Sequence, residues 1–210
     1  RDRRTSRGLG DVYKRQSGAR ISIIDKSKEI IFEDSCIYNY EFKNPEGWIN
    51  SCIKLFEGIP IQIKINLSRL SISGTSGTLV PCSSNGAALG NSIPYYEVCT
   101  SNPEKLNLIA GEDKFLNNPY SSLAKAIKLI DIFGDDIILR HQADWISGWF
   151  LNDWSFGEEG NNIKLGWNIE NKSWPESFES FSLTKSIPVI KESGSILGKI
   201  NQSIANLLGT

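Results

Sequence analysis

Two short segments carry the residue types best suited to hold a polar ligand: Ser17-Gly18-Ala19-Arg20 and Gly74-Thr75-Ser76-Gly77-Thr78. Glycines in such turns let backbone N–H groups approach an anionic or polyhydroxyl ligand without a Cβ clash, and the hydroxyls add hydrogen bonds. Each segment alone is also typical of a plain tight turn. Neither segment ends in Gly-Lys-Ser or Gly-Lys-Thr, which excludes a P-loop nucleoside triphosphatase.

Four further side chains have alternative interpretations. Tyr120 is either a ligand contact or a packed side chain at the start of a helix. Asp144 is either a helix N-cap or a carboxylate of the site. Glu158 either binds ligand hydroxyls or lies in an exposed loop. The single histidine, His141, would have to serve any Ser-His-Asp triad, but no Gly-x-Ser-x-Gly elbow is present. A partly buried side chain at the end of an element is the simpler interpretation of His141.

The four cysteines show neither a Cys-x-x-Cys spacing nor paired histidines beside them. A disulfide framework and a zinc site are therefore not expected, and no metal-binding residue is assigned. This pattern is typical of reduced thiols, and we expect a cytoplasmic protein.

Hydrophobic periodicity predicts the elements that position these side chains. Strands are expected over 20–25, 29–38, 67–72, 79–84 and 137–139, the first two as a hairpin. Helices are expected from Pro45, over 119–133, from Asp144, from Trp174-Pro175 and over 200–209. Mixed strands and helices of this kind predict an α/β domain.

Charge and hydropathy limit the partners. The net charge is −1, so there is no electrostatic reason to expect nucleic acid. No apolar run reaches the roughly 18 residues of a membrane span, and a membrane partner is not expected either.

The first 16 residues differ from the rest of the chain. They hold six of the 23 Lys and Arg residues but only two of the 24 Asp and Glu residues, and the chain contains no Met. The segment Asp11-Val12-Tyr13-Lys14-Arg15-Gln16 looks like the translation of a transposon end used to build sequencing libraries. We therefore expect residues 1–16 to be a library artefact rather than native protein, and a basic arm that binds nucleic acid or membrane is the alternative.

Taken together, the motifs resemble the N-terminal lobe of the FGGY carbohydrate kinases. SGARISIID, LSISGTSGT, PYSSLAKAIKL, HQADWISGWF and NNIKLGW occur in that family's order and spacing, over residues 17–209. The closest likeness is to the plant and cyanobacterial type of D-ribulose kinase. The resemblance implies an actin-like, ribonuclease H-like α/β fold. It also implies transfer of the γ-phosphate of ATP, with Mg²⁺, to a hydroxyl of a ketopentose such as D-ribulose.

The resemblance also implies roles for individual residues. The phosphate- and substrate-binding set is Ser17, Gly18, Arg20, Gly74, Thr75, Ser76 and Thr78. Weaker sugar contacts are Tyr120, Asp144 and Glu158. The family's first phosphate motif would place its Asp, Gly and Thr on Tyr13, Arg15 and Gln16, and its catalytic Asp is expected beyond Thr210. We therefore expect residues 17–210 to be a sugar-binding lobe truncated at both ends and inactive by itself.

Two other functions stay open at this point. One is a non-catalytic carbohydrate-binding or regulatory module on the same lobe, and the other is an unrelated α/β domain, which the order of the motifs disfavours. The choice of D-ribulose over another small sugar or glycerol rests on the resemblance alone, because fold does not fix the substrate.

Overall fold

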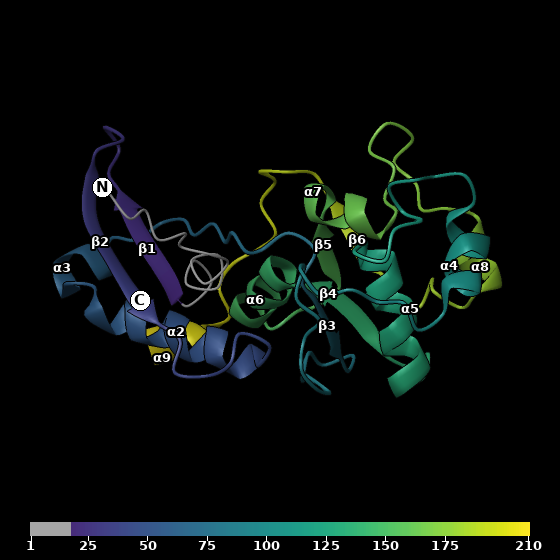
Figure 1. Cartoon of the computed structure of the whole chain (residues 1–210). Helices are drawn as coiled ribbons and strands as arrows, with labels where there is room; N and C mark the ends of the chain where they lie inside the picture. The colour runs from purple at the N-terminus through teal and green to yellow at the C-terminus, as the bar shows by residue number, and fades with distance from the viewer. Residues whose placement is uncertain (1–17) are drawn as a thin grey trace, which may run out of the picture. The chain divides into compact units, whose positions relative to one another are not determined.

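The computed structural model describes residues 18–210 (Figure 1). Two compact units are present among them: residues 18–68 with 208–210 belong to the N-terminal unit, and residues 69–207 form the central unit. The expectations for residues 1–16 and for Ser17 lie outside the described residues.

A β-hairpin opens the described part of the N-terminal unit. Strands β1 (Gly18–Ile24) and β2 (Ile30–Ile37) pair antiparallel, with a register shift between Ile23 and Ile24. In the turn, the Asp25 carboxylate accepts hydrogen bonds from two backbone N–H groups, and Lys28 adopts a positive φ of 68°. This confirms the hairpin predicted from the sequence.

Helix α2 (Pro45–Gly58) packs against the hairpin. Asn44 caps it by accepting a hydrogen bond from the Glu46 N–H, and Pro45 occupies the first helical position, where its missing N–H costs nothing. The helix buries Trp48, Leu55 and Phe56. The predicted start of this helix is confirmed.

Two expectations for this part of the chain are wrong. Residues 67–72 form no strand; the short helix α3 (Ile61–Lys64) precedes a stretch without regular structure. Gly18 and Ala19 lie inside β1 rather than in a turn before it, whereas Arg20 lies in the strand as the 20–25 pattern predicts. A strand exists only where a second strand supplies hydrogen bonds, and that pairing is a tertiary property that local alternation does not specify.

The central unit contains two small pairs of strands. Strand β3 (Leu79–Cys82) pairs antiparallel with β4 (Ile138–His141), and β5 (Phe156–Glu158) pairs parallel with β6 (Val189–Lys191). Strand β3 is buried throughout. The sequence predicts β3 and β4 but gives no signal for the short strands β5 and β6.

Helices surround these strands. The central unit contains α4 (Pro103–Ala110), α5 (Ser122–Phe133), α6 (Gln142–Leu151), α7 (Glu159–Asn162), the 3₁₀ turn η1 (Ile163–Leu165) and α8 (Ser177–Ser180), and α9 (Gln202–Leu208) ends the chain. Helix α5 starts after its N-cap Ser121 and stops before Gly134, which has a φ of 84°. Its end was predicted correctly, whereas the segment before Ser121 lies outside the helix. The sequence missed α4.

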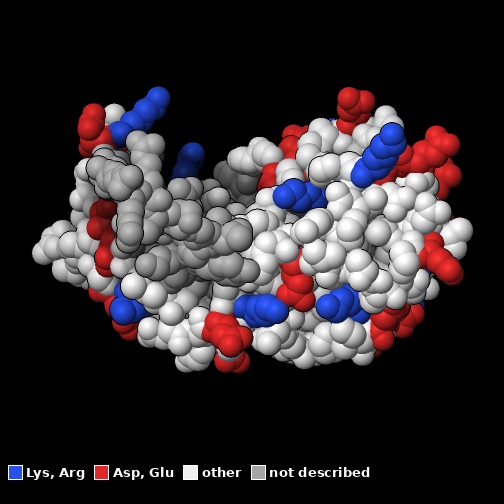
Figure 2. All heavy atoms as spheres, viewed as in Figure 1, with Lys and Arg blue, Asp and Glu red and all other residues white. Residues whose placement is uncertain are grey.

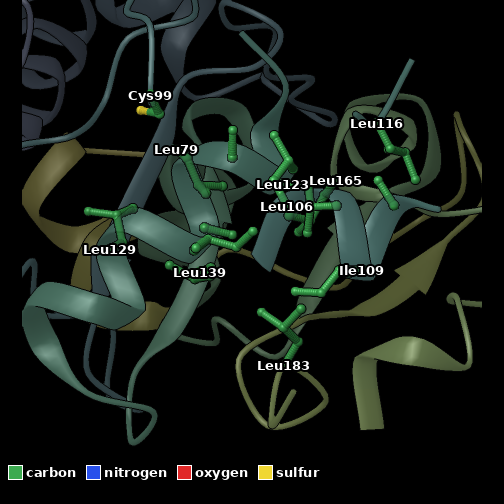
Figure 3. Close-up of a cluster of buried hydrophobic side chains, with 14 of the residues drawn as sticks. Leu79, Cys99, Leu106, Ile109, Leu116, Leu123, Leu129, Leu139, Leu165 and Leu183 are labelled. Atoms are coloured by element: carbon green, nitrogen blue, oxygen red, sulfur yellow. The ribbon is translucent and has the colours of Figure 1, made fainter. Parts of the chain in front are cut away.

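One hydrophobic cluster holds the central unit together (Figure 3). Strands β3 and β4 contribute Leu79 and Leu139, while α5 contributes Leu123 and η1 contributes Leu165; all four are fully buried. Burying each aliphatic side chain stabilises the fold by roughly 1.5–3 kcal/mol. The packing of these four side chains therefore holds β3, β4, α5 and η1 together. The polar residues described below lie at the ends of these elements.

The face in Figure 2 carries acidic and basic side chains interspersed with uncharged ones.

Among residues 18–210, no helix has both the length and the apolar character needed to cross a bilayer. All four cysteines are free thiols.

Candidate functional site

The Gly74–Thr78 turn runs directly into β3. The Thr78 N–H donates to the Thr75 carbonyl over 3.3 Å, and Gly77 has a φ of +89°. A positive φ at the third position of a four-residue turn is typical of a type II turn and favours glycine there. The Ser76 side chain is exposed at the tip. The structure therefore confirms a turn here.

Residue Gln142, the first residue of α6, holds this turn. Its Oε1 accepts hydrogen bonds from both the N–H and the hydroxyl of Thr75, each over 2.8 Å. The Thr75 and Thr78 hydroxyl oxygens are 2.7 Å apart, and the Gln142 N–H donates to the Thr78 carbonyl over 3.1 Å. The turn is thus bound to the junction between β4 and α6.

Two lysines lie close to the turn. The Lys164 Nζ donates to the Ser76 carbonyl over 3.3 Å, and its Cδ would lie 3.3 Å from a Cβ added to Gly77. Lys125 is fully buried, and its Nζ donates to the Tyr120 carbonyl over 2.5 Å. Burial lowers the pKa of Lys125 to about 8, and nearby Lys164 acts in the same direction. One half-buried and one fully buried lysine therefore lie within this region.

The side chain of Tyr120 is 54% exposed, so the packing interpretation is wrong. Tyr120 also precedes the N-cap of α5 instead of lying on the helix. Its backbone carbonyl accepts a hydrogen bond from the buried Lys125 ammonium.

Asp144 is not a helix N-cap, because α6 begins two residues earlier and His141 occupies the cap position. The Asp144 side chain is 4% exposed. It accepts hydrogen bonds from the Glu158 N–H and from the side-chain amides of Asn161 and Asn162, over 3.0–3.3 Å. Burial raises the pKa of Asp144 to about 6 in spite of these three donors. Asp144 thus ties α6 to the segment that joins β5 to α7.

His141 is fully buried instead of partly buried, with 1% of its surface exposed. Its Nε2 lies 2.9 Å from the Ser122 hydroxyl, and its Nδ1 lies 3.8 Å from an Asp144 carboxylate oxygen. Burial lowers the pKa of His141 to about 3, so the ring is neutral at pH 7. Ser122 is itself fully buried, so this Ser-His-Asp arrangement is not open to a substrate.

Glu158 caps α7 and is not in an open loop. Its carboxylate accepts hydrogen bonds from the N–H groups of Gly160 and Asn161, each over 2.8 Å, and from the Ser193 hydroxyl. Partial burial would raise the pKa of Glu158, but these donors outweigh it and the pKa is lowered. Most of its acceptor capacity is used within the protein.

Gly18 and Arg20 belong to the N-terminal unit. Gly18 pairs with Ile37 across the hairpin, and a Cβ added there would lie 2.2 Å from the Cys36 carbonyl oxygen. Glycine is therefore required by the close approach of two strands rather than by a turn. The Arg20 side chain is exposed.

The described residues offer no metal site. Within residues 18–210, no group of three or more His, Cys, Asp and Glu side chains could hold a metal ion. The resemblance implies Mg²⁺, but the described residues do not fit it, so no step is derived through a metal.

Three residues of this region were not singled out from the sequence: Gln142, Lys164 and Asn162. Gln142 lies in HQADW and Lys164 and Asn162 lie in NNIKLGW, two of the segments that carry the resemblance. Their residue types alone are common on any surface, so only a family alignment could have signalled them.

Solved structures similar to this chain are carbohydrate kinases, and no family model matches the sequence. A xylulose kinase from Brucella ovis is similar over 92% of this chain and 44% of its own length, with a TM-score of 0.76 and 14% identity. A gluconate kinase from Lactobacillus acidophilus gives a TM-score of 0.72 over 92% of this chain and 44% of its own, at 11% identity. A glycerol kinase from Plasmodium falciparum gives a TM-score of 0.69 over 89% of this chain and 43% of its own length, at 14% identity.

The chain shares its fold with a part of these kinases. The mixed helix and strand content confirms the α/β class predicted from the sequence. The chain spans less than half the length of each of these kinases.

Proposed function

We propose that this chain is the sugar-binding N-terminal lobe, actin-like in fold, of a cytoplasmic ATP-dependent carbohydrate kinase of the FGGY family. The complete enzyme transfers the γ-phosphate of ATP to a hydroxyl of a ketopentose such as D-ribulose. The observation that carries the proposal is the fold likeness to the Brucella ovis xylulose kinase over 92% of the chain. The motif order read from the sequence supports it independently.

The Gly74–Thr78 turn is the proposed sugar contact in this lobe. Ser76 is exposed at its tip, and Gly77 lets the backbone turn there. Tyr120 offers a second exposed polar group on the same unit. Gly18 and Arg20 remain proposed phosphate-binding residues of the N-terminal unit, together with Ser17. A hydroxyl and an aromatic ring are typical partners of a sugar in a site of few, well-placed polar groups.

Phosphoryl transfer needs more than these residues. It depends on charge neutralisation around the transferred group and on a base for the attacking hydroxyl. The described residues contain no metal-binding cluster, and Asp144 and Glu158 are used internally. We therefore assign catalysis to a complete protein that contains this lobe, and we expect the 210-residue chain alone to be inactive.

The test measures sugar-dependent ADP formation by the complete gene product, with D-ribulose, D-xylulose, glycerol and gluconate as acceptors and the 210-residue chain as comparison. D-ribulose is expected among the best acceptors, with no turnover by the shorter chain. Absence of turnover with every acceptor, together with sugar binding, would favour a non-catalytic binding module. Turnover by the 210-residue chain would contradict the assignment of catalysis.

A second test addresses the turn. Ser76→Ala is expected to weaken D-ribulose binding to the chain about fivefold to tenfold, as loss of one hydrogen bond of about 1 kcal/mol implies. Isothermal titration calorimetry measures it. Ser203→Ala, on the exposed side of α9, is the matched control and should leave the affinity unchanged. Equal affinities in both variants would remove Ser76 from the site.

A further inference from the structure

We propose that Gln142 is a positioning residue of the Gly74–Thr78 turn, which fixes the direction of its hydrogen bonds and leaves Ser76 as its one side-chain hydroxyl free for a ligand. The turn's role in sugar binding rests on the proposed function. The role of Gln142 follows from geometry that is independent of any substrate.

The orientation of the Gln142 amide is settled by its partner. The Thr75 backbone N–H can only donate, and it lies 2.8 Å from Gln142 Oε1. The oxygen of the amide must therefore face Thr75, because an NH₂ group at that place would oppose one donor with another. Gln142 is 3% exposed, so water does not compete for this oxygen.

The direction of the remaining bonds follows step by step. Because an amide oxygen carries no hydrogen, the Thr75 hydroxyl must donate its single hydrogen to Gln142 Oε1. In the 2.7 Å contact between the two hydroxyls, Thr78 must then be the donor. Thr78 Oγ1 in turn accepts the Tyr95 N–H over 3.2 Å. The chain of bonds thus runs from Tyr95 through Thr78 and Thr75 to Gln142.

This direction determines what the turn offers to a ligand. Both threonine hydroxyl hydrogens are used inside the protein, and Thr78 is fully buried as well. A phosphate oxygen, which needs donors, gains none from either side chain. The exposed Ser76 hydroxyl forms no hydrogen bond within the described residues, so it is the one hydroxyl that the turn offers to a ligand. It can both donate to and accept from a sugar hydroxyl.

The direct test is a through-hydrogen-bond coupling in the unsubstituted, isotope-labelled chain, measured by NMR between the Thr75 amide nitrogen and the Gln142 side-chain carbonyl carbon. The coupling is expected to be detectable. Its absence, in spectra where backbone couplings of β3 and β4 are seen, would overturn the proposal.

The second test uses hydrogen exchange at the Thr75 amide. Gln142→Leu is expected to lower the protection of this amide about tenfold or more. Gln142→Glu keeps an acceptor oxygen, so its protection should stay within about threefold of that in the unsubstituted chain. Gln62→Leu, on the exposed side of α3, is the matched control. The Leu139 amide, which donates to the Ser186 carbonyl, reports whether the unit is folded. Unchanged Thr75 protection in folded Gln142→Leu, or no rescue by Glu, would overturn the proposal.

A third experiment, on D-ribulose binding, distinguishes failure of the proposed function from failure of the role proposed for Gln142. Thr75→Val and Ser76→Ala are compared for D-ribulose binding by calorimetry. Only Ser76→Ala should remove a bond to the ligand, so it should weaken binding more than Thr75→Val does. If the unsubstituted chain binds no sugar, the proposed function fails, while Gln142 is still judged by the coupling and the exchange rates.

Discussion

The Gly74–Thr78 turn and the carboxylates Asp144 and Glu158 are two regions of the central unit whose residue types both indicate a ligand site. In the turn, buried groups bind one another and the exposed Ser76 stays available. In the carboxylate pair, six donors inside the protein occupy the acceptor oxygens. The difference teaches that a side chain of suitable chemistry serves a ligand only when the fold leaves it unsatisfied.

The largest effect is expected for Asp144→Ala. It leaves the Glu158 N–H and the buried Asn162 amide without their acceptor, which should reduce the free energy of unfolding by about 3 kcal/mol. Urea unfolding at pH 7.5 measures it. Asp135→Ala, at an exposed position, should change stability by less than about 0.5 kcal/mol. A loss below about 1 kcal/mol in Asp144→Ala would mean that the carboxylate is not structural.

A pH series tests the burial of Asp144 separately, because Asp144 and His141 are expected to change the free energy of unfolding in opposite directions as pH falls. The pKa of His141 is lowered to about 3, so stability is lost as pH falls below its unfolded value of about 6.5. The pKa of Asp144 is raised to about 6, so its contribution to stability increases as pH falls from above 6 towards 4. In Asp144→Asn only the histidine effect remains.

We therefore expect acidification from pH 7 to pH 5 to cost Asp144→Asn about 1 kcal/mol more than the unsubstituted chain. Denaturant unfolding at a series of pH values gives both curves. Parallel curves would show that Asp144 has a similar pKa in the folded and unfolded states.

Within the turn, Thr78→Val should cost about 1 kcal/mol, because valine keeps the size of threonine but removes the acceptor of the Tyr95 N–H. Thermal unfolding measures it, with Thr184→Val at an exposed position as control. A change equal to that of the control would contradict the hydrogen-bond chain derived for the turn.

The smallest effect is expected for Glu158→Gln. The variant keeps a capping oxygen for α7 but loses the negative charge beside the Gly160 and Asn161 N–H groups, so about 0.5 kcal/mol is expected. Urea unfolding measures it, with Glu179→Gln as the exposed control. D-ribulose affinity should not change, in contrast to Ser76→Ala, and a clear loss of affinity would restore Glu158 to the ligand site.

Local chemistry made several parts of this fold predictable. The hairpin follows from alternation around a turn at Lys28, and the start of α2 follows from Pro45. The end of α5 follows from Gly134. Each signal acts within one or two turns of the chain, through capping or through a backbone conformation that few residues accept.

Contacts distant in sequence were not predictable in the same way. The 67–72 segment has the pattern of a strand but forms none. Asp144 has the residue type of an N-cap but lies in the first turn of α6, where donors some 14 to 18 residues away surround it. Gln142 holds a residue 67 positions away. The sequence by itself determined the turn residues, the caps and the periodic faces, because these depend on neighbours along the chain. Only the tertiary structure decided which polar atoms were consumed and which stayed free, because hydrogen-bond partners are chosen by packing.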